Sequence, residues 1–103
     1  MKKAKILLDR ILDISERYRV ELKVFEVDPN EKYPEGIKAR FVLVDVVKKV
    51  PRLVIDNHAP FGFHLHNGLP EEKERRITLN ISDYLQALDK FRDLVKEILD
   101  NEI

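Results

Sequence analysis

Apolar and polar residues alternate with a period of two through the middle of the chain, and this pattern limits the fold more than any other feature. Segments 17–24, 36–47 and 51–58 each place apolar side chains on one face and mostly charged or polar ones on the other. Such alternation is typical of β-strands that bury one face and expose the other. We therefore expect an antiparallel sheet in which Leu53 and Ile55 face the core.

The last quarter of the chain has helical periodicity instead. Its apolar residues recur at spacings of three and four over residues 81–101, which predicts a helix whose apolar stripe packs on the core. The stripe comprises Tyr84, Leu85, Leu88, Phe91, Val95, Ile98 and Leu99. Asn80 or Ser82 can cap the start of this helix, and Asp83 suits its positive N-terminal end.

The remaining segments complete the expected fold. Residues 74–80 read as a short strand before the helix, whereas the apolar positions of residues 3–12 fit a helix and a strand equally well. The fold class is α+β, an antiparallel sheet of four to five strands with a long C-terminal amphipathic helix packed on one face. At this length we expect a single domain, 1–103.

Composition excludes several classes of protein. No apolar run approaches the roughly 20 residues that cross a bilayer, and the opening residues lack the pattern of a signal peptide. The chain has no cysteine and therefore no disulfide framework, so we expect a cytoplasmic protein. Its 19 basic and 19 acidic residues cancel, so any nucleic-acid contact must come from a local patch. A charged content of 37% is typical of heat-adapted proteins.

All the histidines of the chain lie within nine residues, beside an aspartate. Alternation along the third strand places Arg52, Asp56 and His58 on the face opposite the core. His64 and His66 are two residues apart, so both imidazoles point to one side if their segment is extended. The fold can therefore gather two or three imidazoles and one carboxylate.

An acid–base site is the first hypothesis for this cluster. His64 and His66 would cleave RNA, one taking the proton of the 2′-hydroxyl and the other protonating the leaving 5′-oxygen, because imidazole titrates near neutral pH. Asp56 would fix a tautomer. Three arginines are candidates to offset the charge that builds on the phosphate: Arg52, Arg75 and Arg76.

Two other hypotheses remain open. As a metal site, the cluster would offer nitrogen and oxygen ligands and an open position to Zn²⁺ or Mn²⁺. As structural residues, the histidines would cap strand ends and bond to loop carbonyls. We predict no metal or other cofactor; if a metal is bound, the ligands are His58, His64, His66 and Asp56.

The succession of motifs resembles the TumE-type toxin family of toxin–antitoxin modules over roughly residues 3–101. The resemblance is carried by EKYPEGIKARFVLVD, VIDNH, HLH and the amphipathic C-terminal segment. Asp56 and Asn57 match the aspartate-asparagine pair of the family pattern, and His64 and His66 match its histidine-x-histidine. The chain departs from the family pattern in two places. Ile55 stands where tyrosine is usual, and the turn, which is glycine- and lysine-rich in the family, reads Ala-Pro-Phe-Gly-Phe here.

The resemblance implies that residues 3–12 form a strand, and that the partner is a helix-turn-helix antitoxin. It suggests a ribonuclease, for which we expect His64, His66 and Asp56 to be catalytic, with His58, Asn57 and the three arginines in support. The alternative is a non-enzymatic protein- or nucleic-acid-binding module of the same fold, and the third hypothesis is a metal-dependent phosphodiesterase. A second copy could cover a free sheet edge, giving a homodimer.

Overall fold

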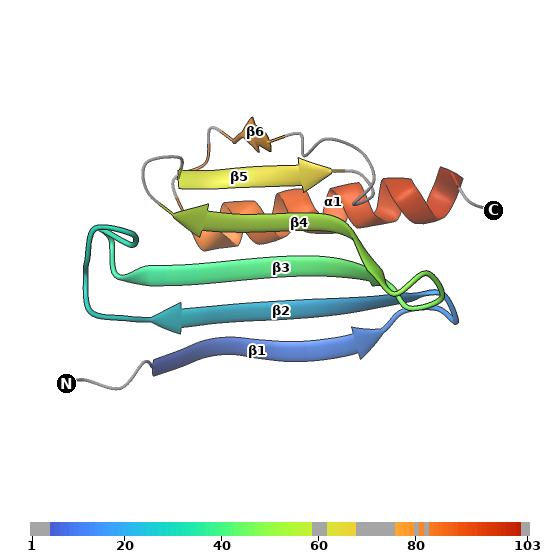
Figure 1. The fold of residues 1–103 in the computed structure, drawn as a ribbon, viewed down its shortest axis with the longest axis horizontal. Coiled ribbons are helices and arrows are strands. Elements are labelled where there is room, and N and C mark those ends of the chain that lie inside the picture. Colours follow the sequence, from blue (N-terminus) through green and yellow to red (C-terminus); the bar gives the residue numbers. More distant parts are fainter. Residues whose placement is uncertain (1–4, 59–61, 68–75, 80, 82, 102–103) are drawn as a thin grey trace.

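The structure is a computed structural model that describes residues 5–58, 62–67, 76–79, 81 and 83–101. Within these residues six strands pair in chain order into one antiparallel sheet, followed by one helix (Figure 1). The elements are β1 (Lys5–Asp13), β2 (Tyr18–Glu26), β3 (Ile37–Asp45), β4 (Val50–His58), β5 (Gly62–Asn67), β6 (Arg76–Thr78) and α1 (Tyr84–Asn101). The predicted α+β class is confirmed. β6 lies within the strand predicted at residues 74–80, and the strand beyond the four or five expected is β5, in the segment of His64 and His66.

The ambiguous N-terminal segment is a strand. β1 pairs with β2 along its length, from the Lys5–Glu26 pair to the Asp13–Arg19 pair, with Leu7 as an extra residue at a register shift. Apolar periodicity could not separate helix from strand here, because β1 is an edge strand in which only Leu8 is not exposed, and the register shift at Leu7 breaks its alternation. Pairing with β2 decides its conformation.

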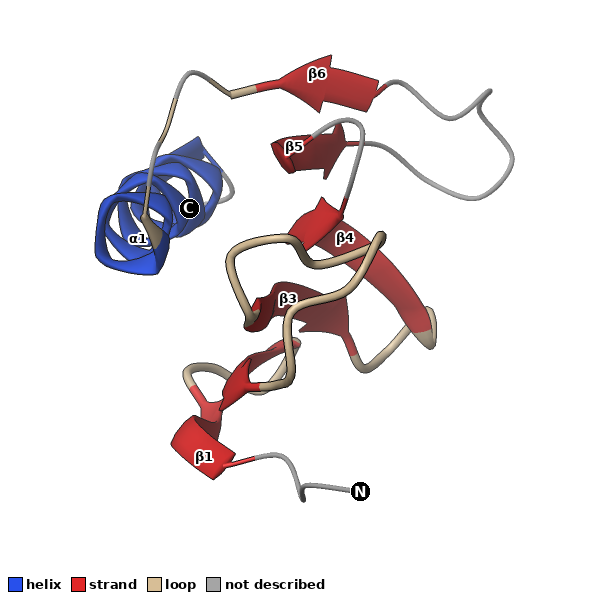
Figure 2. Ribbon diagram, turned by 90° about the vertical axis from the view of Figure 1, so that its left-hand side faces the viewer, coloured by secondary structure: helices blue, strands red, loops and turns tan. Residues whose placement is uncertain are grey.

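The helix packs on one face of the sheet and closes the core (Figure 2). Alternate side chains of β2 to β5 meet the inner side of α1, as Phe41 and Phe91 do with ring centroids 5.9 Å apart. The predicted inward positions are confirmed, since Leu53 and Ile55 are 1% and 0% exposed. We call this side of the sheet the inner face and the opposite side the outer face.

Two details of the helix differ from the prediction. Leu85 is 60% exposed and Ala87 is fully buried, because at 3.6 residues per turn Leu85 lies at the flank of the stripe and Ala87 near its centre. The N-cap is Asp83, whose Oδ1 accepts a hydrogen bond of 2.9 Å from the backbone N–H of Gln86. The predicted caps Asn80 and Ser82 lie outside the described residues.

One helix is too narrow to cover this sheet. Six strands at a spacing of about 4.8 Å span about 24 Å, whereas a helix with its side chains is about 10 Å wide. α1 packs on β3 and β4 and lies away from β1 (Figure 2). On the inner face Leu12 of β1 is consequently left 39% exposed. Ile6 and Ile11, which pair with Phe25 and Glu21 on the outer face, are exposed as well.

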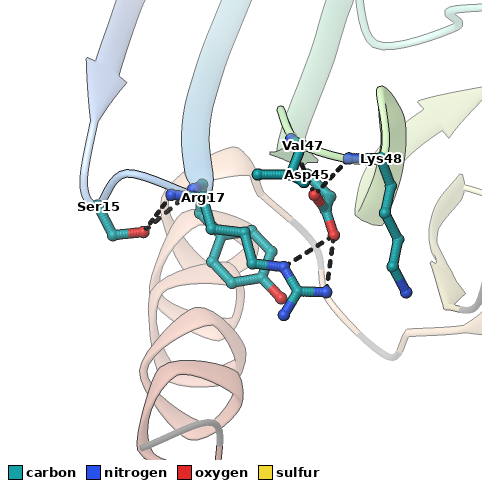
Figure 3. Close-up of polar contacts among 6 residues, drawn as sticks. Ser15, Arg17, Asp45, Val47 and Lys48 are labelled. Carbon is teal, nitrogen blue, oxygen red and sulfur yellow. Dashed lines mark hydrogen bonds and ion pairs between the residues drawn. The ribbon is translucent and has the colours of Figure 1, made fainter.

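A buried carboxylate ties two hairpin turns together at one end of the sheet (Figure 3). Asp45 is 1% exposed. Its Oδ2 accepts a hydrogen bond of 3.1 Å from Nε of Arg17 and lies 3.0 Å from Nη2 of the same guanidinium. Its Oδ1 accepts hydrogen bonds from the backbone N–H groups of Val47 and Lys48 at 3.1 and 2.9 Å. The β1–β2 turn is thereby fixed to the β3–β4 turn.

These contacts determine how the charge of Asp45 responds to pH. Burial by itself would raise the pKa of Asp45, but the hydrogen bonds from Lys48, Arg17 and Val47 and the charge of Arg17 outweigh it and lower that pKa. The unfolded chain therefore takes up this proton at a higher pH, about 3.9, than the folded protein does. The stabilisation is present above that pH and is lost as the pH falls through the folded-state pKa.

We expect the free energy of unfolding to fall as the pH drops below about 4. Asp45→Asn should be less stable at pH 7 and should lose less stability on acidification. Urea unfolding at pH 7 and at lower pH measures both effects, with Asp28→Asn, at an exposed position, as the matched control. If Asp45→Asn lost as much stability on acidification as the wild type, Asp45 would not be the group responsible.

Candidate functional site

A row of polar side chains crosses the outer face of the sheet. The strand register places Asp9 opposite Lys23, Lys23 opposite Arg40, Arg40 opposite Asp56, and Asp56 opposite His64. Directly opposed residues of an antiparallel pair have Cβ atoms about 5 Å apart on one face. An acid, two cations, a second acid and an imidazole therefore follow one another across five strands.

Asp56 and His64 are in direct contact within this row. Nε2 of His64 lies 2.6 Å from Oδ1 of Asp56. The other ring nitrogen, Nδ1, lies 2.8 Å from the carbonyl oxygen of Gly62, the first residue of β5. The imidazole is 0% exposed and the side chain of Asp56 is 25% exposed.

This geometry limits the protonation of the pair. A carbonyl oxygen can only accept a hydrogen bond, so Nδ1 of His64 carries a hydrogen. If Asp56 is ionised, Nε2 also carries a hydrogen and the pair is an imidazolium beside a carboxylate. If Asp56 is protonated, the ring is neutral. In both states the pair carries one proton besides that on Nδ1, either on Nε2 or on the carboxyl group.

The accessible end of the pair is the carboxylate rather than the imidazole. Both ring nitrogens of His64 face protein oxygens, and the ring is buried. Asp56 is in contrast partly exposed on the outer face. In this arrangement Asp56 is the group that can meet a substrate, and His64 is a positioning residue behind it. A direct acid–base role for His64 stays a prediction, and it would require the ring to move.

Asn57 holds the strand that carries Asp56. Its Oδ1 accepts a hydrogen bond from the N–H of Ala39 at 2.8 Å, and its Nδ2 donates one to the carbonyl of Ile37 at 2.8 Å. These bonds follow the last backbone pair of β3 and β4, Arg40 with Asp56. Because a buried backbone group left without a partner costs about 1–3 kcal/mol, Asn57 supports the site through the backbone.

The described side chains do not bring the other predicted site residues to the Asp56–His64 pair. Arg52 lies four residues before Asp56 on β4, which is about 13 Å along a strand. The backbone of His66 pairs with Arg76 on β6 and with Val54 on β4. The side chains of His58, His66 and Arg76, and the whole of Arg75, lie outside the described residues, so their roles stay predictions.

Sequence reasoning did not assign Lys23 and Arg40 to the site. Arg40 is exposed and directly opposes Asp56, and Lys23 is half-buried beside it. The alternation of each strand does place both residues on the polar face. The register that joins them to Asp56 depends on pairing between distant segments, which no single strand pattern specifies.

The metal hypothesis depends on residues that the structure does not describe. Among the described residues no group of three or more histidine, aspartate or glutamate side chains could hold a metal ion. The zinc or manganese site predicted from the sequence needs His58 or His66 in addition to the Asp56–His64 pair. His64 would also have to give up one of its two present contacts to bind an ion. In the part of the chain described here, no helix is long and apolar enough to cross a membrane.

Comparison with known proteins identifies no family for this chain. The chain matches no model of a protein family, no curated protein and no solved structure. The resemblance to TumE-type toxins therefore rests on the sequence motifs alone. Function has to be argued from the site and not from the fold.

The ring of His64 should carry a proton on Nδ1 at neutral pH, because the Gly62 carbonyl cannot donate one. Long-range ¹H–¹⁵N correlation spectra report the protonation of each ring nitrogen, and His64→Gln identifies the resonances. We expect Nδ1 to be protonated and Nε2 to be protonated or to share its proton with Asp56. A ring protonated on Nε2 alone would contradict the observed geometry.

Proposed function

We propose that the protein is the toxin of a toxin–antitoxin module and acts on RNA through the outer face of its sheet. The toxin role rests on the resemblance in the sequence, with a helix-turn-helix antitoxin as the implied partner. The observation that carries the action on RNA is the contact of Asp56 with His64 in the same row as Lys23 and Arg40. A proton-carrying pair next to phosphate-binding cations is what cleavage of a phosphodiester requires.

The two cations would hold the RNA backbone. Arg40 is exposed and offers a planar set of donors that matches a phosphate group in two hydrogen bonds. Lys23 stands on the neighbouring strand, so both can contact one phosphate or two successive ones. Because the chain has no net charge, this contact relies on the local patch and should weaken as the salt concentration rises.

The carboxylate would then act on the 2′-hydroxyl. Asp56 takes the 2′-hydroxyl proton as the 2′-oxygen attacks phosphorus, and the protonated ring of His64 holds the carboxylate in place. The bond from phosphorus to the 5′-oxygen breaks, and a second acid protonates that oxygen; His66 is the candidate from the sequence. The products are a 2′,3′-cyclic phosphate and a 5′-hydroxyl, and Arg40 stabilises the charge on the phosphate.

A non-enzymatic binding module is the second candidate, and one observation favours it. The ring of His64 is completely buried and both its nitrogens contact protein oxygens, as in a histidine that joins two strands. In that case the Asp56–His64 pair only stabilises the β4–β5 hairpin. Lys23 and Arg40 would then bind nucleic acid or protein without chemistry.

Replacing the carboxylate tests the proposal. Induced in a host that lacks the antitoxin, the wild type should arrest growth. The purified wild type should cleave RNA even when a chelator is present. Asp56→Asn should relieve the arrest and lower the cleavage rate by about 100-fold or more, the usual contribution of a general base. Asp9→Asn makes the same substitution in the same row, at the edge strand, and should behave as the wild type.

The same assay separates the two candidates. If Asp56→Asn arrests growth fully while Arg40→Glu does not, the protein acts by binding and the catalytic assignment is wrong. If the wild type neither arrests growth nor cleaves RNA, the toxin role itself is wrong. Circular dichroism and urea unfolding confirm that each variant is folded.

A further inference from the structure

The inner face of β1 and β2 forms an open apolar groove beside the helix, with a volume of about 420 Å³. Val20 and Leu22 of β2 line it together with Leu12 of β1. Leu88 and Phe91 contribute the α1 side. The groove is where the single helix leaves the sheet uncovered, and it is unrelated to the polar row of the outer face.

Cations lie on both long sides of this groove. Arg92 and Lys96 line it from α1, and both are exposed. On the other side Arg10 pairs with Leu22 in the strand register, so it shares the inner face with a residue that lines the groove. Arg92 also contacts Asp89 at 3.1 Å, but both side chains are largely exposed and such a pair is easily exchanged for another.

The size of the groove fits one further helix. The part of the sheet beyond α1 is about two strands wide, which is the width that one helix covers. A helix lying there would bury the exposed Leu12 and continue the layer begun by α1. It would need one apolar stripe for the groove and acidic residues on both flanks of that stripe, to meet Arg10 on one side and Arg92 and Lys96 on the other.

The helix of a second copy does not have this character. The apolar stripe of α1 is already packed on its own sheet through Ala87, Phe91 and Val95. The exposed side of α1 is mostly charged, with Asp89, Lys90, Asp93, Glu97 and Asp100. A second α1 placed in the groove would therefore bury charged side chains against apolar ones.

We propose that this groove binds an amphipathic helix of a partner protein, whose apolar stripe is flanked by aspartate or glutamate. This is the helix-in-groove mode of recognition, in which apolar anchors at helical spacing enter a hydrophobic groove. The apolar floor supplies the affinity, and the cationic rims select an acidic helix and set its position. The inference does not depend on what the outer face does.

Two designed peptides test it. Each is a helix of about 18 residues with leucines at spacings of three and four; one has glutamate on both flanks of the stripe and the other has lysine there. Fluorescence anisotropy with labelled peptide measures the dissociation constant. The glutamate peptide should bind at least about tenfold more tightly than the lysine peptide, and Leu12→Glu, at an exposed edge position, should abolish binding.

A charge reversal makes the test specific. Arg92→Glu with Lys96→Glu should reverse the preference, so that the lysine peptide binds more tightly. Lys32→Glu with Lys90→Glu makes the same change in net charge at exposed positions outside the groove and should leave the preference unchanged. Growth arrest and RNA cleavage should be the same in both double variants, which separates this inference from the proposed function.

Three results would overturn the inference. One is that neither peptide binds, or that both bind equally. Another is that binding is indifferent to Leu12→Glu or to the charge reversal. The third is a wild-type dimer in analytical ultracentrifugation that Leu12→Glu dissociates, because a second copy would then occupy the groove.

Discussion

A single helix has to cover a sheet more than twice its own width, and the rest of the structure follows from this mismatch. The chain has one apolar stripe at helical spacing. That stripe packs on the middle of the sheet, where the buried side chains of β3 and β4 meet Phe91. The described residues provide no element over the outer face or over β1. Both surfaces to which we assign function lie in these uncovered regions.

The outer face contains one interaction that a solvated sheet face does not need. Burying an imidazole beside a carboxylate carries a desolvation penalty, and the mutual attraction offsets it only where the geometry is good and further hydrogen bonds are made. Here the carbonyl of Gly62 provides that further bond to His64, and Asn57 fixes the strand that carries Asp56. Removing Asp56 would leave the buried ring of His64 with a missing contact.

A second buried polar group with satisfied hydrogen bonds lies at the other end of the sheet. Asp45 is as deeply buried as His64, but its oxygens receive two backbone N–H groups and the guanidinium of Arg17. It joins two turns and offers no exposed oxygen to a ligand. Comparison of the two sites shows why Asp56 is the better candidate for chemistry: it is the partly exposed member of a pair that holds a proton.

Much of the fold follows from the sequence because its patterns are local. Alternation places Leu53 and Ile55 inside and Asp56 outside, and helical spacing places Phe91 and Val95 on the core, all of which the structure confirms. Leu85 is the exception, because two adjacent residues of a helix cannot both lie at the centre of one stripe.

What the sequence does not determine is the relation between distant segments. β1 is decided by its pairing with β2, and the position of Arg40 opposite Asp56 is decided by the register of β3 with β4. The contact of His64 with Asp56 is decided by the register of β4 with β5. The site was therefore predicted as a group of residue types, whereas the order in which they face solvent came only from the structure.

The most direct measurement is a titration of ¹⁵N-labelled protein with single-stranded RNA of about ten nucleotides, followed by amide chemical shifts at low and at high salt. We expect the shift changes to centre on Lys23, Arg40 and Asp56, to be smaller at high salt, and to leave Leu12 and Leu22 in the groove unchanged. Changes confined to the groove and α1, or no change at low salt, would contradict the assignment of the outer face to RNA.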